Sequence, residues 1–282
     1  MLVTMKEILD HAKAGGYGVT APNVQSEDTV RAVIEVAEKY KAPMIIDVNT
    51  FVHPDIPWFI GMIRDLAMKA SVPIAINLDH GKTYEDMILG IRSGFTSIMV
   101  DRSSLPYDEN VAQTKEVVKM CKVLGISVEA ELGHVGQGQS YENDGVNNLT
   151  DPEEAARFIK ETGIDCLAVA IGTAHGRYKG VPHIDFDRLK KIAETCKDTP
   201  LVLHGGSGTG DENLAKAIQC GIQKVNLATE LIVAGKEELE IFIQDPNFDK
   251  WKLIPSFKKG YMERLGHYVE LFGQKGKAWT KD

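Results

Sequence analysis

Short runs of apolar residues alternate along the chain with longer segments in which apolar positions recur every three or four residues. The short runs are rich in Val, Ile and Leu at consecutive positions, which is typical of strands buried on both faces of a parallel sheet. The longer segments indicate amphipathic helices, and several begin at Asp or Thr and end at Gly, residues that favour helix caps. Eight strands are predicted, at residues 17–21, 44–48, 74–78, 96–100, 127–132, 166–171, 201–203 and 222–227.

Eight strand-then-helix units in unbroken alternation predict an α/β fold, a (β/α)8 TIM barrel. An open, doubly wound sheet is the alternative. No linker rich in Pro, Gly or Ser interrupts the pattern, so we expect a single domain over residues 1–282, with extra C-terminal helices from about residue 230. A helical tail on a barrel often packs on a neighbouring subunit, so we expect a homo-oligomer.

Composition narrows the class of protein. A chain of 282 residues, 43% of them hydrophobic, can build a core without disulfides or a structural metal. The net charge of −8 argues against nucleic acid as a partner, because neutralising phosphates supplies most non-specific affinity. The four cysteines form no CxxC pair, and we find neither a secretory signal nor an apolar run long enough to span a bilayer. We therefore expect a cytoplasmic protein with no membrane partner.

Acidic, imidazole and amide side chains lie at the carboxyl ends of the predicted strands. Barrel enzymes build their active sites at this end. The residues, in chain order, are Asp79, His80, Asp101, Glu131, His175, His204 and Asn226. Because random placement would scatter such residues over both ends, the pattern favours a site.

Three histidines, His80, His175 and His204, each follow a strand and have a neighbouring glycine. Three imidazoles and an open position are typical of catalytic zinc, and imidazole suits zinc better than magnesium. Three hydrogen-bonded histidines at a barrel mouth are the alternative. Asp79, beside His80, is a candidate general acid/base, or alternatively the N-cap of the next helix.

Glu129 and Glu131 alternate with apolar residues, so both carboxylates lie on one face of their strand. Two acids on an inward face are costly unless they meet a cation or a substrate hydroxyl. We expect them to support a metal-binding histidine or to provide a ligand. A pair that faces the surface is the alternative.

The glycine-rich segment HGGSGTG, at residues 204–210, ends the seventh strand, and the segment VNLATE, at residues 225–230, ends the eighth. Barrels commonly bind phosphate there, through backbone N–H groups and a helix N-terminus. Gly205, Gly206 and Ser207 would let the chain approach an anion closely, and Thr229 can donate a hydroxyl. Ordinary turn glycines are the alternative.

These motifs together resemble one family. The segments LDHG, GFTSIMVD, VEAELG, AVAIGTAHGRYKG, LHGGSG and KVNLATEL, with the ending LFGQKGKA, are similar to the class II, zinc-dependent ketose-bisphosphate aldolases over nearly the whole chain. The resemblance implies a (β/α)8 barrel, a homodimer or homotetramer, and reversible cleavage of a phosphorylated ketose to dihydroxyacetone phosphate and an aldehyde.

Roles are carried over by position. His80, His175 and His204 correspond to the ligands of one Zn²⁺ per subunit. Asp79 corresponds to the acid/base that handles the proton of the C4 hydroxyl, and Asn226 to the amide that steadies the enediolate.

Further positions match the rest of the family's site. Asp101 and Glu131 correspond to acids that could hold an alternative metal position, and Asn23 to an asparagine near the substrate. A sodium or potassium ion is often bound near the family's phosphate site. The positions that match this site are Gly176, Lys179, Gly205, Ser207, Ala228 and Thr229.

Three segments depart from the family's pattern. Asn49 stands where a Ser-x-Gly is usual, Arg102 follows Asp101 where Asp-Gly-Ser is usual, and the loop at 133–150 lacks the usual Gly-Gly-x-Glu-Asp. We therefore expect the ketose, or its anionic group, to differ from fructose bisphosphate. Asn49 and Arg102 are candidate specificity residues, and Arg102 could instead form a salt bridge on the rim.

The sequence leaves three other functions open. A lysine-imine aldolase would use Lys224 on the eighth strand. A non-catalytic, zinc-binding sugar-phosphate sensor would keep the histidines without the reaction, and a metal-dependent epimerase or hydrolase is a weaker option.

Overall fold

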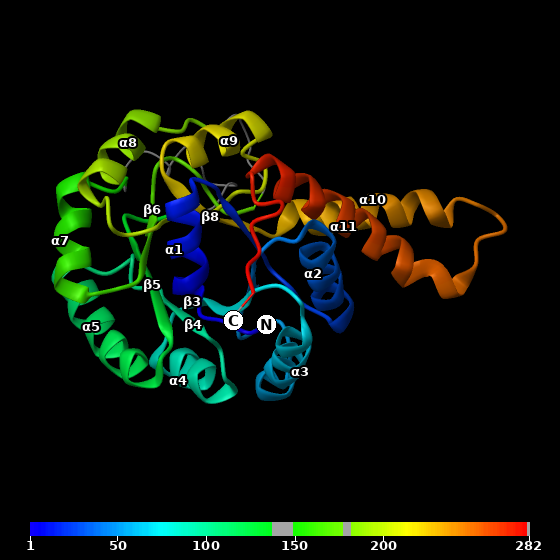
Figure 1. Cartoon of the computed structure of the whole chain (residues 1–282), viewed down its shortest axis with the longest axis horizontal. Helices are drawn as coiled ribbons and strands as arrows, with labels where there is room; N and C mark the ends of the chain where they lie inside the picture. Colours follow the sequence, from blue (N-terminus) through cyan, green and yellow to red (C-terminus); the bar gives the residue numbers. More distant parts are fainter. Residues whose placement is uncertain (137–148, 177–181, 281–282) are drawn as a thin grey trace.

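The computed structural model describes residues 1–136, 149–176 and 182–280, and within them eight parallel strands form a barrel surrounded by helices (Figure 1). This arrangement confirms the predicted (β/α)8 barrel. The strands β1 to β8 are Val19–Pro22, Met44–Val48, Ile74–Gly81, Ser97–Val100, Ser127–Leu132, Cys166–Val169, Leu201–Leu203 and Ile222–Leu227.

The barrel closes at its carboxyl end. Hydrogen bonds join the strands in the order β1-β8-β7-β6-β5-β4-β3-β2. Between β1 and β2, Asn23 forms a bridge with Asp47, and the Val24 amide donates to the Asp47 carbonyl at 3.1 Å. The remaining seam is therefore held at the end where barrel enzymes place their sites.

The helix ends follow from local sequence. Capping boxes at Ser26 and Thr83 precede α2 and α4. α4, α5 and α7 end at left-handed Gly94, Gly125 and Gly163, as the Gly-terminated segments predict. The described helices are α1 (Met5–Gly15), α2 (Glu27–Tyr40), α3 (Ile56–Lys69), α4 (Tyr84–Ser93), α5 (Tyr107–Leu124), α7 (Pro152–Thr162), α8 (Phe186–Thr195), α9 (Asp211–Gln219), α10 (Thr229–Ile243) and α11 (Leu253–Leu271). None of them is long and apolar enough to cross a membrane.

Strand boundaries differ from the prediction where other segments take over the hydrogen bonds. β1 begins later than predicted because the Gly18 amide donates to the Phe272 carbonyl at 2.9 Å. β6 ends earlier because the Ala170 amide donates to Thr150 Oγ1 at 2.8 Å, and the Thr150 amide returns a bond to the Ala170 carbonyl at 2.9 Å.

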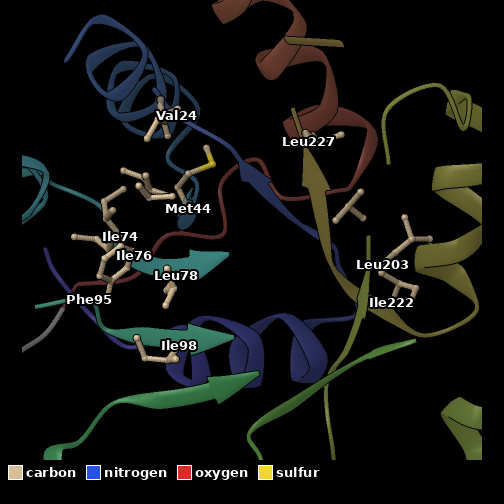
Figure 2. Close-up of a cluster of buried hydrophobic side chains, with 14 of the residues drawn as sticks. Val24, Met44, Ile74, Ile76, Leu78, Phe95, Ile98, Leu203, Ile222 and Leu227 are labelled. Atoms are coloured by element: carbon tan, nitrogen blue, oxygen red, sulfur yellow. The ribbon is translucent and has the colours of Figure 1, made fainter. Parts of the chain in front are cut away.

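Two apolar clusters lie on opposite sides of the barrel wall. Outward-facing residues such as Ile76, Leu78 and Ile98 pack beneath the helices (Figure 2). Inward-facing residues such as Ile45 and Val202 form a smaller cluster with α1, which closes the amino-terminal end of the barrel. Alternation of side chains along each strand separates the two sets.

Above the inner apolar cluster, the inward positions become polar. Asp47, Asn77, Glu129 and Lys224 form a fully buried layer inside the barrel. The next inward positions on three of these strands are Asp79, Glu131 and Asn226, at the mouth. These charged and amide side chains inside the barrel therefore lie toward its carboxyl end.

The expected C-terminal helices are α10 and α11, which form a hairpin that projects from the barrel (Figure 1). A turn of 3-10 helix, Lys250–Lys252, precedes α11. A Cβ at Gly260 would lie 2.3 Å from the Ala234 carbonyl oxygen, and one at Gly235 would lie 2.7 Å from the Phe257 ring. Small residues therefore allow the two helices to pack closely.

Candidate active site

A cavity of about 660 Å³ opens at the carboxyl end of the barrel. The residues predicted from different strands share it, because its lining includes Asn23, Asn49, Asp79, His80, Asp101, Glu131, His175, Gly176, Ala228 and Thr229. His204 is fully buried beside the cavity, where its Nδ1 contacts His80 Nε2. The structure thus brings the candidate residues of several strands to one place.

The three histidines present one nitrogen each to a common point. His80 Nε2 lies 3.2 Å from His175 Nε2 and 3.1 Å from His204 Nδ1. Tetrahedral zinc with Zn–N bonds of 2.0–2.1 Å needs its nitrogen ligands about 3.3 Å apart. The two distances are close to this spacing, and all three ligand atoms lie within 4.8 Å of one another, so these residues would fit a zinc ion.

Carboxylates hold the outer nitrogens of two of the rings. His80 Nδ1 lies 2.9 Å from Asp101 Oδ2, and His204 Nε2 lies 2.8 Å from Glu129 Oε1. Because an ionised carboxylate only accepts hydrogen bonds, the outer nitrogen of each ring carries a proton, and the inner nitrogen is the one available to a metal. This is the arrangement that metal-binding histidines need.

Charges around the rings also favour one shared cation. Burial lowers the pKa of His80, but Asp79 and the hydrogen bond to Asp101 raise it, with a net pKa of about 9. Burial, with repulsion from His204 and His80, lowers the pKa of His175 to about 4. The adjacent rings therefore cannot all be positively charged, although carboxylates surround them.

The backbone at the end of β3 lets two adjacent residues reach the cavity, although neighbours in a strand normally point to opposite faces. His80 has a φ of 54°, in the left-handed region that non-glycine residues rarely adopt. The pairing of β3 with β4 shifts register between Leu78 and Gly81. A Cβ at Gly81 would lie 2.7 Å from the Met99 carbonyl oxygen, so the turn requires glycine. This bulge turns both Asp79 and His80 into the site.

Three asparagine amides surround Asp79. Its Oδ2 accepts from Asn23 Nδ2 at 2.8 Å and from Asn49 Nδ2 at 3.1 Å, and its Oδ1 accepts from Asn226 Nδ2 at 3.2 Å. Burial raises the pKa of Asp79, but the charge of His80 and the other neighbours outweigh it and hold the pKa below the usual range. Asp79 is therefore a carboxylate able to accept a proton. It does not cap α4, because Thr83 does.

Asp101 and Glu131 form a second acidic group with His80 whose ligand atoms lie within 4.8 Å of one another. Glu131 Oε1 accepts from the Val135 amide at 3.0 Å. Its Oε2 is buried and has no hydrogen-bond partner among the described residues. Burial raises the pKa of Glu131. Both predicted acids thus lie beside the histidines, and the alternative of a surface-facing Glu129–Glu131 pair is wrong, because both side chains are buried.

A side chamber of about 50 Å³ adjoins the cavity at the glycine-rich loops. The predicted cradle residues Gly176, Gly205, Gly206, Ser207, Ala228 and Thr229 line it, together with Asn226. α10 begins here after Ala228, which makes no side-chain cap, and Ser207 Oγ accepts from the amides of Ala228 and Glu230 at 3.4 and 3.3 Å. The positive end of a helix therefore faces this chamber, which favours an anion there.

Glycine is required at two positions of this chamber. Gly205 has a φ of 70°, and a Cβ on it would lie 2.3 Å from the Ala174 carbonyl oxygen. A Cβ on Gly206 would lie 2.7 Å from the Asn226 carbonyl oxygen. Lys179, also predicted for the cradle, lies outside the described residues.

Arg102 does not line the main cavity. Its Nε donates to Gln113 Oε1 at 2.5 Å, and its Nη1 donates to the carbonyl oxygens of Lys82 and, at 3.1 Å, Asp101. The guanidinium also lies 5.4 Å from the centroid of the Tyr84 ring. It holds the turn after β3, so its position does not support the prediction that it recognises a substrate anion.

Lys224 is enclosed inside the barrel and lines none of the cavities described here. Its Nζ donates to Glu129 Oε2 at 2.8 Å and lies 3.4 Å from Asp47 Oδ2. Burial lowers the pKa of Lys224, but these carboxylates outweigh it and raise the pKa above its ordinary value. An enclosed ammonium cannot attack a carbonyl, so the lysine-imine alternative is not supported.

His134 is a cavity residue that the sequence analysis does not name. Its Nδ1 lies 3.0 Å from Ser103 Oγ and 3.8 Å from Glu131 Oε1. Its position two residues after the fifth strand was the available signal.

Residues 3–277 match the family model described as fructose-bisphosphate aldolase class-II. A curated fructose-bisphosphate aldolase from Geobacillus stearothermophilus is 39% identical, and the alignment covers 98% of this chain and 99% of the relative.

Solved structures agree with this match. The YdjI aldolase from Escherichia coli K12 is 34% identical with a TM-score of 0.86, covering 99% of this chain and 100% of that one. A fructose-bisphosphate aldolase from Campylobacter jejuni has a TM-score of 0.83 at 23% identity, covers 98% of this chain and 97% of that one, and supports the fold.

Proposed function

The chain belongs to the class II fructose-bisphosphate aldolase family, and from this premise we propose that a zinc ion held by His80, His175 and His204 serves its reaction. The protein is an aldolase, a carbon–carbon lyase that cleaves a ketose bisphosphate. The proposed products are dihydroxyacetone phosphate and an aldehyde. The sensor, epimerase and hydrolase alternatives are not favoured by these relatives.

The convergence of three imidazole nitrogens beside a buried carboxylate carries the zinc proposal. When bound, zinc supplies a Lewis acid that polarises the substrate carbonyl. Asp101 and Glu129 orient His80 and His204 by accepting from their outer nitrogens.

Asp79 is the proposed base in the cleavage direction. Its carboxylate takes the proton of the C4 hydroxyl, and the same group returns the proton during condensation. The amides of Asn23, Asn49 and Asn226 hold the carboxylate in place. Asn226 Oδ1 is buried without a partner among the described residues, which makes this amide a candidate contact for the substrate.

We propose that the side chamber holds the phosphate of the dihydroxyacetone half. The N-terminal end of α10 and the closely approaching backbone at Gly205 and Gly206 support this. A sodium or potassium ion near the same loops, which would offset the phosphate charge, is part of the proposal. Asn49 contacts Asp79 at the cavity wall and is the proposed specificity residue.

We also propose that the α10–α11 hairpin packs on a second copy of the chain in a homodimer or homotetramer. Ile241 and Trp251 expose 67% and 80% of their surface on this projecting element. Sedimentation of the wild type and of Trp251→Glu tests this, and a monomeric wild type would contradict it. The free cysteines fit the proposed cytoplasmic location.

Metal removal tests the proposed zinc chemistry. Dialysis against EDTA should abolish cleavage of fructose and tagatose bisphosphates, and Zn²⁺ should restore it. Borohydride added with substrate should leave the enzyme active, because no imine forms. Full activity in excess chelator would contradict the proposal. Absence of any aldehyde from a ketose-phosphate panel, with Zn²⁺ supplied, would favour the sensor.

A further inference from the structure

A charged layer lies inside the barrel directly below the three histidines. Lys224 contacts two carboxylates there, Glu129 Oε2 at 2.8 Å and Asp47 Oδ2 at 3.4 Å. Asp47 Oδ1 accepts from Asn77 Nδ2 at 2.9 Å. All four side chains are fully buried.

The two oxygens of Glu129 serve different partners. Oε2 accepts from Lys224, and Oε1 lies 2.8 Å from His204 Nε2. On the other side of the same ring, His204 Nδ1 lies 3.1 Å from His80 Nε2. An unbroken series of contacts therefore runs from the lysine in the barrel interior to the ligand nitrogen.

Donor and acceptor chemistry gives this series a direction. A lysine ammonium only donates, so the atom of residue 129 that faces Lys224 must be an acceptor. A carboxylate offers acceptors on both sides, so it also accepts from His204 Nε2–H. His204 then has no proton on Nδ1, and this nitrogen presents its lone pair toward the other two histidines.

We propose that Lys224 is a positioning residue for His204: through Glu129 it fixes the ring proton on Nε2 and leaves Nδ1 free to bind the metal. This inference rests on the proposed zinc site. Lys224 lines neither of the described cavities and contacts none of the three histidines among the described residues, so its proposed effect on His204 passes through Glu129.

Glutamine at position 129 separates this role from simple charge balance. A carboxamide has one acceptor and one donor end. With Lys224 present, the oxygen must face the lysine, so the NH2 group faces His204 Nε2 and drives the ring proton to Nδ1. With Lys224→Met, the amide can rotate and accept from Nε2–H again. Adding Lys224→Met to Glu129→Gln should therefore return the ring proton of His204 to Nε2.

The experiment compares wild type, Glu129→Gln, Glu129→Gln/Lys224→Met and Asp47→Asn. Asp47→Asn is the matched control, because it alters the other carboxylate on the same lysine but contacts no histidine in the described structure. The ring proton of His204 is located by ¹⁵N NMR of histidine-labelled, metal-free protein at about pH 8, where an ordinary histidine is neutral. Zinc affinity is measured by competition with a chromogenic chelator, and folding by circular dichroism.

We expect Nε2–H at His204 in the wild type and in Asp47→Asn, with similar zinc affinity. Glu129→Gln should show Nδ1–H and bind zinc about 10–100-fold more weakly. The double variant should return to Nε2–H and regain about tenfold or more of the loss.

Several outcomes would overturn the inference. They are an Nδ1–H tautomer in the wild type, an unchanged tautomer in Glu129→Gln, a double variant no tighter than the single one, or a tautomer change in Asp47→Asn. The wild-type measurement decides the matter if Glu129→Gln does not fold. If all tautomers behave as expected but the wild type binds no zinc, the proposed function fails while the positioning by Lys224 stands.

Discussion

Replacing Asp79 by asparagine removes the proposed base with little change of shape. The new oxygen can keep the position of Oδ2 and still accept from Asn23 and Asn49. The new NH2 group then faces Asn226 Nδ2, which is a clash of two donors. Rotation of the Asn226 amide turns its Oδ1, which has no partner in the described structure, toward this NH2 group. The number of hydrogen bonds is thereby kept.

The free energies follow from this geometry. With no net hydrogen bond lost, the cost in unfolding free energy should stay near 1 kcal/mol. Loss of a positioned base lowers kcat by about 10²–10⁴-fold, which corresponds to about 3–5 kcal/mol of transition-state stabilisation. Zinc affinity should change little, because Asp79 Oδ1 is 3.8 Å from His80 Nε2 and Asp79 is not one of the converging ligands.

Two assays distinguish the loss of the proposed base from a general loss of activity. Release of dihydroxyacetone phosphate from the ketose requires loss of the C4 hydroxyl proton. Exchange of solvent deuterium into dihydroxyacetone phosphate breaks a C–H bond and does not involve that hydroxyl. Asp79→Asn should therefore lose cleavage and retain most of the exchange. The reasoning is refuted if kcat falls less than about tenfold, if exchange is lost in parallel with cleavage, or if the variant no longer binds zinc.

Three further substitutions test other parts of the site. Arg102→Ala should lower the unfolding free energy by about 1.5–3 kcal/mol through its lost backbone contacts, while KM for a phosphorylated ketose stays unchanged; a raised KM with normal thermal unfolding would restore the anion-binding role. Gly205→Ala should lower the unfolding free energy by about 1–3 kcal/mol and raise KM more than it lowers kcat. Gly16→Ala is the control, because Gly16 has a φ of 62° and open space for a Cβ; it should lower the unfolding free energy without a change in KM. His134→Ala should raise KM with unchanged zinc affinity, because His134 lines the cavity but is not among the converging imidazoles; a loss of zinc would place it among the ligands.

The barrel could be predicted because its signal is repeated. Each strand is a short apolar run, each connection is a helix, and chemistry-bearing residues such as Asp79 and His204 stand at the same end of their runs. The alternation of Glu129 and Glu131 with apolar neighbours likewise gave their shared face, since strand side chains alternate with a period of two.

The rest of the site depends on contacts between distant segments. The left-handed φ of His80 and the register shift of β3 arise from pairing with β4, and no local pattern marks them. Its sequence position near the mouth makes Arg102 a candidate anion ligand, but its guanidinium donates instead to the Lys82 carbonyl oxygen in the turn after β3 and to Gln113 Oε1 in α5. Asn23 and Asn49 meet at Asp79 only because β1, β2 and β3 are neighbours around the barrel.

The buried charges below the mouth need a reason other than stability. An apolar layer of similar volume is often as stable as a buried ion pair, or more so, because burial removes the charges from water. Lys224, Glu129 and Asp47 nevertheless occupy the inward positions between the apolar floor and the histidines. Hydrophobic contact alone cannot decide which nitrogen of His204 carries the proton, since the two tautomers have almost the same shape. The Lys224 ammonium below the Glu129 carboxylate selects the tautomer of His204. The polar layer can therefore fix the position of the ring proton, which an apolar layer could not do.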